Sequence, residues 1–291
     1  MTKLGDDRDR RFVLFEMLKI QELKQYPKFA DYDRDTFEMV MGEAEKFAEN
    51  VLWPLNQKGD EEGCHWKDGE VKTPEGFKAA YDQFVEGGWL TPGDDPEDGG
   101  QGLPQSLCTA CSECFHGSNM AFANYPNLTH GAGRLLKLFG TPEQKEKYLT
   151  RMWSGEWAGT MCLTEPGAGS DLGILKTKAK RREDGKFLIE GTKTFITGGQ
   201  HDLTPNSSIR CWPGSRATRP GPRASPSSSS PATWSTRTGR AERTTMSSAW
   251  ASSTRWGSRA RPPASSRSGR TENAWASCWA RSGRAFPSCS T

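Results

Sequence analysis

Residues 161–171 read Met161-Cys162-Leu163-Thr164-Glu165-Pro166-Gly167-Ala168-Gly169-Ser170-Asp171. The stretch begins as a short apolar strand, and Pro166, Gly167 and Gly169 then force the backbone into a tight turn. Such a turn exposes several N–H groups in a concave run, which suits an anionic oxygen or a flat heterocycle. A second string, Thr194-Phe195-Ile196-Thr197-Gly198-Gly199, follows soon after. The functional inferences from the sequence depend on these two strings.

The chain consists of two chemically different parts that meet near Asn206. From residue 207 to residue 291 there is no Leu, Val, Lys, Asp, Tyr, Gln or His, and Ser, Arg, Pro, Ala and Trp dominate. This tail carries 14 Arg and 2 Glu, a net charge of +12, so the first 206 residues carry −9 of the overall +3. Because the tail has almost no aliphatic surface to offset chain entropy, it is predicted to be disordered.

Before the tail, the sequence predicts an α+β fold, with an N-terminal all-α helical domain followed by the start of an antiparallel β-domain. An amphipathic helix is expected over residues 8–24, with Phe12, Phe15, Leu18 and Leu23 on one side. Capping residues and apolar spacing place further helices from Asp33 or Asp35 to Pro54, from Thr73-Pro74 to Gly87, over 103–114, over 128–139 up to Gly140, and from Thr141-Pro142 to Gly155. The last of these is expected to begin with a capping box between Thr141 and Gln144.

The hydrophobic period changes from helix to strand at Trp157. Strands are expected over 159–164, 176–180, 187–189 and 193–197, and Asp184-Gly185 predicts a two-residue hairpin turn. No strand–helix–strand unit with a G-x-G-x-x-G turn is present, so a dinucleotide-binding parallel sheet is not expected.

Metal and disulfide chemistry are not predicted. Cys108, Cys111 and Cys114 form a C-x2-C-x2-C run, but the fourth cysteine of an iron–sulfur ligand set is missing, and the spacing also traces one face of a helix. His116 and His130 lie in the same helical part and are expected to pack as ordinary side chains. The first residues show no secretory or transit signal and no stretch predicts a membrane span, so a cytoplasmic protein is the default expectation.

The two strings together resemble the flavin-binding signature of the acyl-CoA dehydrogenase family. A Gly-x-Gly-Ser turn alone is usually an ordinary connection, so the resemblance rests on the whole first string, its spacing and the second string. It implies a helical N-terminal extension (1–32), the family's N-terminal α-helical domain (33–156), part of its flavin-binding middle β-domain (157–206) and an aberrant tail (207–291). The extension and the lead-in to residue 162 are similar to a longer bacterial branch that includes 3-methylthiopropanoyl-CoA dehydrogenases.

The resemblance also implies residues that bind FAD. The first string would contact the isoalloxazine and ribityl groups, with Thr164 near the pyrimidine edge and Ser170 also near the acyl-CoA. The second string would lie against the other side of the ring, where Thr197 would donate a hydrogen bond to flavin N5. Threonine is also common in strands, so Thr197 as an ordinary strand residue stays an alternative. Phe195 replaces the family's usual Trp and keeps a flat apolar face without an indole N–H. The implied cofactor-binding residues are Met161, Cys162, Leu163, Thr164, Gly167, Gly169, Ser170, Phe195, Ile196 and Thr197.

By resemblance, the reaction is α,β-dehydrogenation of an acyl-CoA thioester: a carboxylate removes the α-proton while a hydride leaves the β-carbon for FAD. The family's base is a glutamate of a C-terminal helical domain. No position here matches it, so no catalytic residue is predicted, and this chain is expected to be inactive and to hold FAD weakly. Electron-transfer flavoprotein or a similar acceptor, and a homo-oligomer in intact relatives, are also implied. Acyl-CoA oxidases, nitroalkane oxidases and flavin monooxygenases share the architecture and stay as alternatives.

Two hypotheses account for the tail. In the first, the reading frame slips by one base near residue 206. Codons for residues 251–257, read one base earlier, can spell Gly-Ile-Glu-His-Lys-Met-Gly, and those for 277–283 can spell Ile-Leu-Leu-Gly-Glu-Glu, and both strings resemble the family. In the second, the Arg-rich tail with its six Trp binds nucleic acid through phosphate contacts and stacking. The frame slip explains the same residues without a further function, so nucleic-acid binding is not expected.

Overall fold

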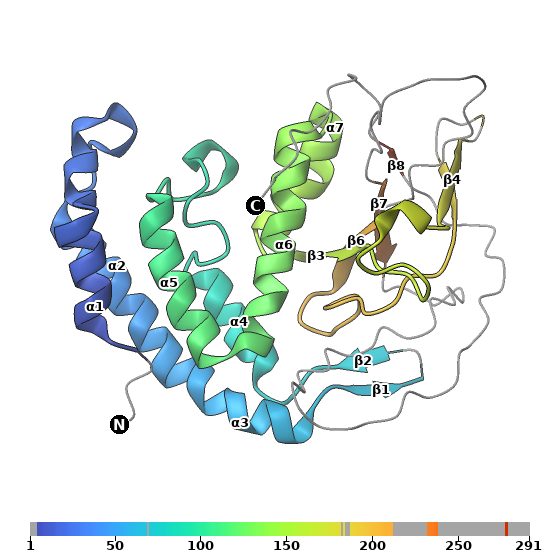
Figure 1. The fold of residues 1–291 in the computed structure, drawn as a ribbon, viewed down its shortest axis with the longest axis horizontal. Helices are drawn as coiled ribbons and strands as arrows, with labels where there is room; N and C mark the ends of the chain where they lie inside the picture. The colour runs from blue at the N-terminus through green and yellow to red at the C-terminus, as the bar shows by residue number, and fades with distance from the viewer. Residues whose placement is uncertain are drawn as a thin grey trace.

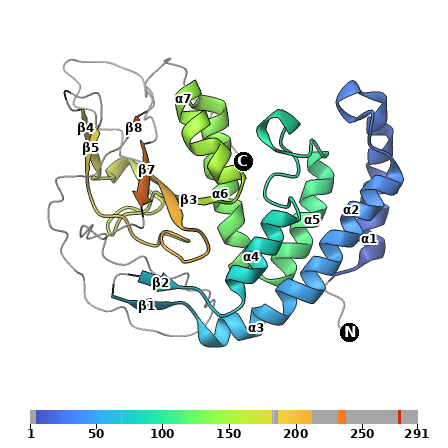
Figure 2. The same cartoon turned by 180° about the vertical axis from the view of Figure 1, so that it is seen from behind.

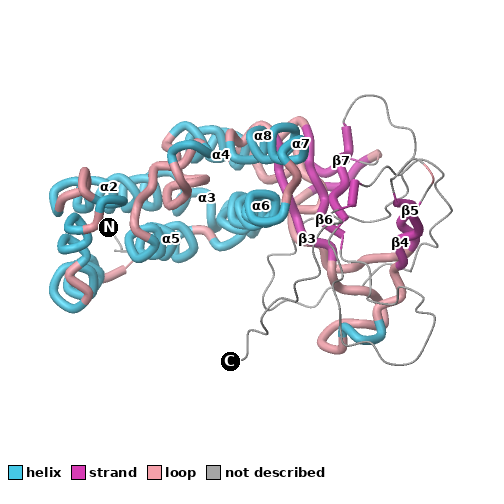
Figure 3. The backbone as a smooth tube through the Cα atoms, turned by 90° about the horizontal axis from the view of Figure 1, so that it is seen from above, coloured by secondary structure: helices cyan, strands magenta, loops and turns pink. Residues whose placement is uncertain are grey.

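The computed structural model describes residues 5–68, 70–181, 183, 187–211, 232–237 and 277–278. The helices gather on one side and most strands on the other, with α6 next to the strands (Figures 1 and 3). The predicted order of an α-helical part followed by strands is therefore confirmed.

The helical segments are α1 (Asp7–Arg11), η1 (Phe12–Met17), η2 (Ile20–Gln25), η3 (Pro27–Phe29), α2 (Arg34–Phe47), η4 (Ala48–Leu52), α3 (Trp53–Glu62), α4 (Phe77–Glu86), η5 (Pro96–Asp98), α5 (Gln105–Ser118), α6 (Met120–Phe139), α7 (Pro142–Gln144), η6 (Lys145–Leu149), α8 (Thr150–Trp153) and η7 (Leu172–Ile174). The strands are β1 (His65–Lys67), β2 (Glu70–Lys72), β3 (Trp157–Cys162), β4 (Lys178–Arg181), β5 (Phe187–Glu190), β6 (Asn206–Cys211), β7 (Ala232–Arg237) and β8 (Ser277–Cys278).

The first long helix continues past the residue where the sequence predicted its end. Asp33 caps α2 through a hydrogen bond to Thr36 N, as expected. Pro54 does not stop the helix, because the π turn η4 leads directly into α3 and places Pro54 in its first turn. The N–H groups of a helix's first turn have no acceptor within the helix, so a proline, which lacks an N–H, is tolerated there.

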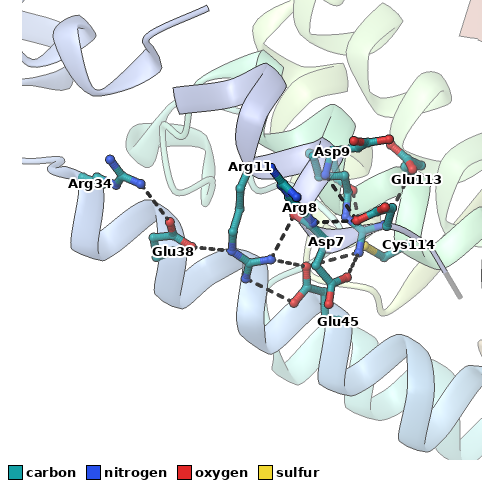
Figure 4. A network of polar contacts seen from close by, with 12 residues as sticks. Asp7, Arg8, Asp9, Arg11, Arg34, Glu38, Glu45, Glu113 and Cys114 are labelled. Atoms are coloured by element: carbon teal, nitrogen blue, oxygen red, sulfur yellow. Dashed lines mark hydrogen bonds and ion pairs between the residues drawn. The ribbon is translucent and has the colours of Figure 1, made fainter. Parts of the chain in front are cut away.

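The N-terminal extension is held to α2 by ion pairs (Figure 4). Arg10 reaches Glu45 at 3.2 Å, and Arg11 reaches Glu38 at 2.8 Å. The predicted apolar face is only partly right, since Phe12 and Leu18 are exposed whereas Leu14, Phe15 and Ile20 are buried. The π turn η1 accounts for the exposure of Leu18, because a wider turn rotates the residues that follow it.

The hairpin β1–β2 joins α3 to α4 and adds two strands to the part predicted to be all helical (Figure 2). The helix α4 begins later than predicted, at Phe77, after Gly76 with a φ of +94°. Thr73 is used elsewhere: its N–H and its hydroxyl donate to Asp202 Oδ1 at 3.0 and 2.8 Å. Thr73, which the sequence predicted as a helix cap, is therefore bonded to the distant Asp202 instead.

The main core lies among α2, α4, α5 and the start of α6. Phe84 contacts Phe115 and Phe122 with ring centroids 5.2 and 5.8 Å apart. The expected cysteine face is present on α5, where Cys111 and Cys114 are buried free thiols. No group of side chains among the described residues could hold a metal ion.

The helix α6 begins eight residues before its predicted start, because Asn119 caps it by accepting a hydrogen bond from Phe122 N at 3.0 Å. It ends at Gly140, as predicted, and Thr141 then forms the predicted capping box with Gln144. No helix of the described residues is long and apolar enough to cross a bilayer.

The helical part contacts the strands mainly through α6. The Thr129 hydroxyl accepts a hydrogen bond from Gly159 N of β3 at 3.1 Å. The segment after the second string returns to the helices, where His201 packs edge-on against Tyr125 at 5.1 Å and Leu203 joins the main core. Burial lowers the pKa of His201 to about 4.

The strands form two sheets beyond the β1–β2 hairpin. The order β3-β6-β7-β8 makes a four-stranded sheet, and β4 pairs with β5 on either side of the predicted Asp184-Gly185 turn, which itself lies outside the described residues. The pairings are antiparallel except that β3 runs parallel to β6, which differs from the antiparallel prediction. Within the tail predicted to be disordered, residues 207–211, 232–237 and 277–278 are in strands, and the rest lies outside the described residues.

A matched pair of glycine substitutions on α6 tests how tightly this helix packs. A Cβ at Gly133 would overlap the indole nitrogen of Trp153, whereas a Cβ at Gly131 meets nothing within 4 Å. We expect Gly133→Ala to lower the free energy of unfolding by about 1–3 kcal/mol, as overpacking does. Gly131→Ala should raise it by about 0.5–1 kcal/mol, because alanine favours the helix. Urea unfolding followed by circular dichroism measures both, and equal effects would contradict the packing described.

Candidate functional site

The first string leaves β3 at Cys162 and turns back on itself. Glu165 and Ala168 exchange two backbone hydrogen bonds of 3.0 Å, which close the turn around Pro166 and Gly167. Both side chains of this closing pair are buried, so the turn is anchored in the protein. The prediction that the backbone leaves the strand here is confirmed.

The outer side of the turn is open and rich in amides. Within the described part of the chain, the N–H groups of Gly167, Gly169 and Ser170 donate no hydrogen bond. A Cβ built at Gly167 or Gly169 meets nothing within 4 Å. Together these exposed amides can donate to oxygen or nitrogen atoms of a ligand.

The second string lies directly beside the first. Thr194 N donates to the carbonyl of Thr164 at 2.9 Å, and the Thr160 hydroxyl donates to the carbonyl of Thr197 at 2.5 Å. The predicted strand over 193–197 is wrong, because these residues have no regular secondary structure. The second string is joined to the first by separate hydrogen bonds and not by a continuous β-ladder.

The ten predicted cofactor-binding residues divide by exposure. Cys162 and Ile196 are buried and pack in one small cluster, so only their backbones can face a ligand. Met161 is 51% exposed and Phe195 is 79% exposed. The others that are exposed are Gly167, Gly169, Ser170 and Thr197, while Leu163 and Thr164 are half-buried.

Phe195 has an unusual backbone conformation. Its φ is +55°, in the left-handed region that a bulky residue rarely adopts. Such strain costs about 1–3 kcal/mol, persists only where neighbouring contacts impose it, and concentrates at functional sites. This strain could not be predicted from local sequence, because it arises from contacts on both sides of Phe195.

Glu165 holds the turn in place and is not among the ten predicted residues. Its carboxylate accepts hydrogen bonds from Lys176 N at 2.7 Å and Thr177 N at 2.9 Å, and Lys193 Nζ lies 2.9 Å away. Burial opposes the charge, but the hydrogen bonds and Lys193 outweigh it and lower the pKa of Glu165 to about 2. The buried charge is therefore compensated from three directions.

A cavity of about 210 Å³ lies in the helical part and was also missed. It is bounded by α4, α5, α6 and the loop before α5, and none of the ten predicted residues lines it. One end is formed by Phe84, Trp89 and Phe115, and the wall on α6 carries His130, whose Nε2 lies 2.6 Å from Asp94 Oδ2. The sequence predicted that His130 packs as an ordinary side chain, and the structure adds that it lines this cavity.

The pKa of Glu165 predicts how stability depends on pH. Because the folded-state pKa is about 2 and a glutamate's ordinary pKa is about 4.3, the contribution of Glu165 is complete above pH 4.3 and is lost as the pH falls toward 2. At neutral pH that contribution is about 3 kcal/mol. We expect Glu165→Gln to lower the free energy of unfolding at pH 7 and to flatten its decline between pH 4.5 and 2.5.

Urea unfolding of the full chain at several pH values provides the measurement. Glu143→Gln, at an exposed glutamate of α7, serves as the control and should keep the wild-type pH profile. A Glu165→Gln profile as steep as that of the wild type would show that the carboxylate is not held in its charged form.

Comparison with protein families locates the chain among known proteins. The acyl-CoA dehydrogenase N-terminal domain matches residues 34–156, and the acyl-CoA dehydrogenase middle domain matches residues 160–206. The matched regions include both strings and the helical part.

Curated relatives agree with this match. The chain is 40% identical over 206 residues to 3-methylmercaptopropionyl-CoA dehydrogenase of Ruegeria pomeroyi, which covers 71% of this chain and 35% of the relative. It is 35% identical over 204 residues to a butyryl-CoA dehydrogenase of Syntrophomonas wolfei, covering 68% of this chain and 33% of the relative. The chain thus spans about a third of the length of these relatives.

Solved structures share the fold. The acyl-CoA dehydrogenase of Geobacillus kaustophilus superposes with a TM-score of 0.54 at 23% identity, covering 71% of this chain and 49% of that one. The predicted resemblance is confirmed by sequence and by fold. This chain therefore belongs to the acyl-CoA dehydrogenase family.

Proposed function

We propose that residues 34–206 form the flavin-binding and acyl-binding part of an FAD-dependent acyl-CoA dehydrogenase, which oxidises a thioester between its α- and β-carbons. The observation that carries the proposal is the meeting of the two strings, where Thr194 bonds to Thr164 and the shared surface combines open amides with the Phe195 ring. The relatives named as dehydrogenases of 3-methylmercaptopropionyl-CoA and butyryl-CoA support it.

The residues present fit FAD. Gly167 and Gly169 leave room for close approach, and the amides of this turn can donate to oxygen and nitrogen atoms of the cofactor. Phe195 and Met161 offer exposed apolar surface to a flat ring, one aromatic and one polarizable. Bound FAD would supply a hydride acceptor, which no amino-acid side chain provides.

The roles of the remaining predicted residues follow from their exposure. The exposed hydroxyls of Ser170 and Thr197 can donate hydrogen bonds to FAD, and we assign Thr197 to flavin N5 and Ser170 also to the acyl-CoA. Cys162 and Ile196 support the site from inside, through packing.

The cavity of the helical part is suited to the acyl group of the substrate. The helix α6 is a wall shared with the sheet: Ala123, Pro126 and His130 line the cavity, while Thr129 bonds to β3. The cavity's volume of about 210 Å³ is below the usual range of about 300–1,000 Å³ for ligand pockets. We therefore propose a short acyl group as the substrate class.

Other parts of the proposal concern partners and location. Two electrons leave the substrate in each turnover, so reduced flavin needs an acceptor, and electron-transfer flavoprotein or a similar protein is expected. A homo-oligomer and a cytoplasmic location, with no membrane or nucleic-acid partner, complete the proposal.

Binding of FAD to the full chain tests the flavin site. We expect weak, reversible FAD binding, measured as quenching of flavin fluorescence, because Phe195 and Met161 are exposed to water. Gly169→Val should raise the dissociation constant about tenfold, equivalent to about 1.4 kcal/mol, by filling the space beside the turn. It should leave the unfolding free energy nearly unchanged, since no protein atom lies within 4 Å of a Cβ there.

The matched control is Gly42→Val on α2, where a Cβ also meets no atom within 4 Å. This variant should bind FAD like the wild type. A wild-type chain that does not quench flavin fluorescence, or equal dissociation constants for the two variants, would contradict the proposed site.

Protection of a cavity thiol tests the acyl site. Burial raises the pKa of Cys108 and that of Cys114 to about 11, and of these two thiols Cys108 lines the cavity whereas Cys114 does not. We expect S-butyl-CoA, a thioether that cannot acylate a thiol, to slow alkylation of Cys108 in the full chain and to leave Cys114 unaffected. S-octyl-CoA should protect Cys108 less, because its chain exceeds the cavity.

Peptide mass spectrometry gives the alkylation rate of each cysteine in one sample, so Cys114 is an internal control. Ala123→Leu, which fills the cavity from α6, should remove the protection, while Ala121→Leu on the same helix, outside the cavity lining, should keep it. Equal protection by the butyl and octyl compounds would contradict a short acyl substrate.

A further inference from the structure

A buried ion pair connects the two strings of the proposed site. Lys193 Nζ lies 2.9 Å from Glu165 Oε1 and donates a second hydrogen bond, also of 2.9 Å, to the carbonyl of Leu163. The two charged side chains are only 3% and 6% exposed. Lys193 directly precedes the second string, whereas Glu165 and Leu163 belong to the first, so one ammonium group holds both.

Phe195 lies between restraints on either side. Before it, Thr194 donates its N–H to the carbonyl of Thr164. After it, the carbonyl of Thr197 accepts the Thr160 hydroxyl. The Phe195 ring is itself largely exposed and its φ is positive, so the contacts of its neighbours impose its conformation.

The physical chemistry of buried ion pairs argues for a directional role. Desolvation can cancel the attraction, and a hydrophobic pair of similar volume is often as stable. A hydrophobic pair cannot supply direction, whereas the Lys193 ammonium donates to two oxygens at fixed positions, Glu165 Oε1 and the carbonyl of Leu163. Glu165 is itself fixed by the backbone N–H groups of Lys176 and Thr177, so the acceptor does not move with its donor.

We propose that Lys193 is a positioning residue for the flavin site: by bridging Glu165 and Leu163, it fixes the segment that presents Phe195 to the isoalloxazine ring. This inference rests on the proposed function, because Phe195 needs a ring to contact. Lys193 is buried and acts through Phe195. Its effect on FAD binding must therefore depend on the Phe195 side chain.

A double-mutant cycle on the full chain tests this dependence. We expect Lys193→Met and Phe195→Ala each to raise the dissociation constant for FAD about tenfold, and the double variant to raise it no further than the larger single effect. Lys193→Arg should restore part of the binding, because arginine keeps the charge and its donors. If the two effects multiply instead, Lys193 acts independently of Phe195 and the proposal is wrong.

A destabilised control separates positioning from general stability. Leu136→Ala removes a buried side chain of α6 that is remote in sequence from both strings. The dissociation constants are compared at temperatures where Leu136→Ala and Lys193→Met show equal folded fractions. Leu136→Ala should then bind FAD like the wild type, and equal weakening in both variants would overturn the proposal.

Hydrogen exchange without FAD distinguishes this inference from the proposed function. Lys193→Met should speed the exchange of the amides of residues 194–198, with little change over α2. Unchanged exchange at 194–198 overturns the inference whether or not the chain binds FAD. A wild-type chain that binds no FAD overturns the proposed function, and with it the role of Lys193 toward flavin, even if exchange at 194–198 accelerates.

Discussion

The carboxylate of Glu165 is the interaction on which the described site depends. It lies inside the turn of the first string and binds the backbone of residues 176–177 and the ammonium of Lys193, so three separate segments meet at one charge. An uncompensated carboxylate at this depth would be strongly unfavourable, and each of its partners is therefore required. These contacts hold the Pro- and Gly-rich turn that follows β3 in one defined conformation.

The helix α6 connects the strands to the helical part of the protein. One of its sides packs on β3, where Thr129 accepts a hydrogen bond from the Gly159 amide. Gly133 of the same helix allows Trp153 of α8 to approach closely. Another side lines the cavity with Ala123 and His130. Because a helix is stiff over a few turns, α6 links the cavity rigidly to β3, the strand from which the first string departs.

Local chemistry explains which features could be predicted from sequence. The turn after Cys162 and the capping box at Thr141 depend on neighbouring residues, and both were predicted correctly. The errors at Pro54, Thr73 and residues 193–197 have a different origin, because a π turn, the distant Asp202 and the contacts of the first string override local preference. The two strings were visible as motifs, whereas the cavity required the packing of three helices.

The described site separates the groups that hold it together from the groups that face outward. Glu165, Lys193, Cys162 and Ile196 are largely buried, while Phe195 and the turn amides are open to solvent. Buried groups contribute to folding whether or not a ligand is present, but exposed amides and an exposed ring gain their interactions only when a ligand covers them. A strained and exposed Phe195 adds nothing evident to folding. The contacts of its neighbours hold Phe195 in this conformation, and its ring stays open to a ligand.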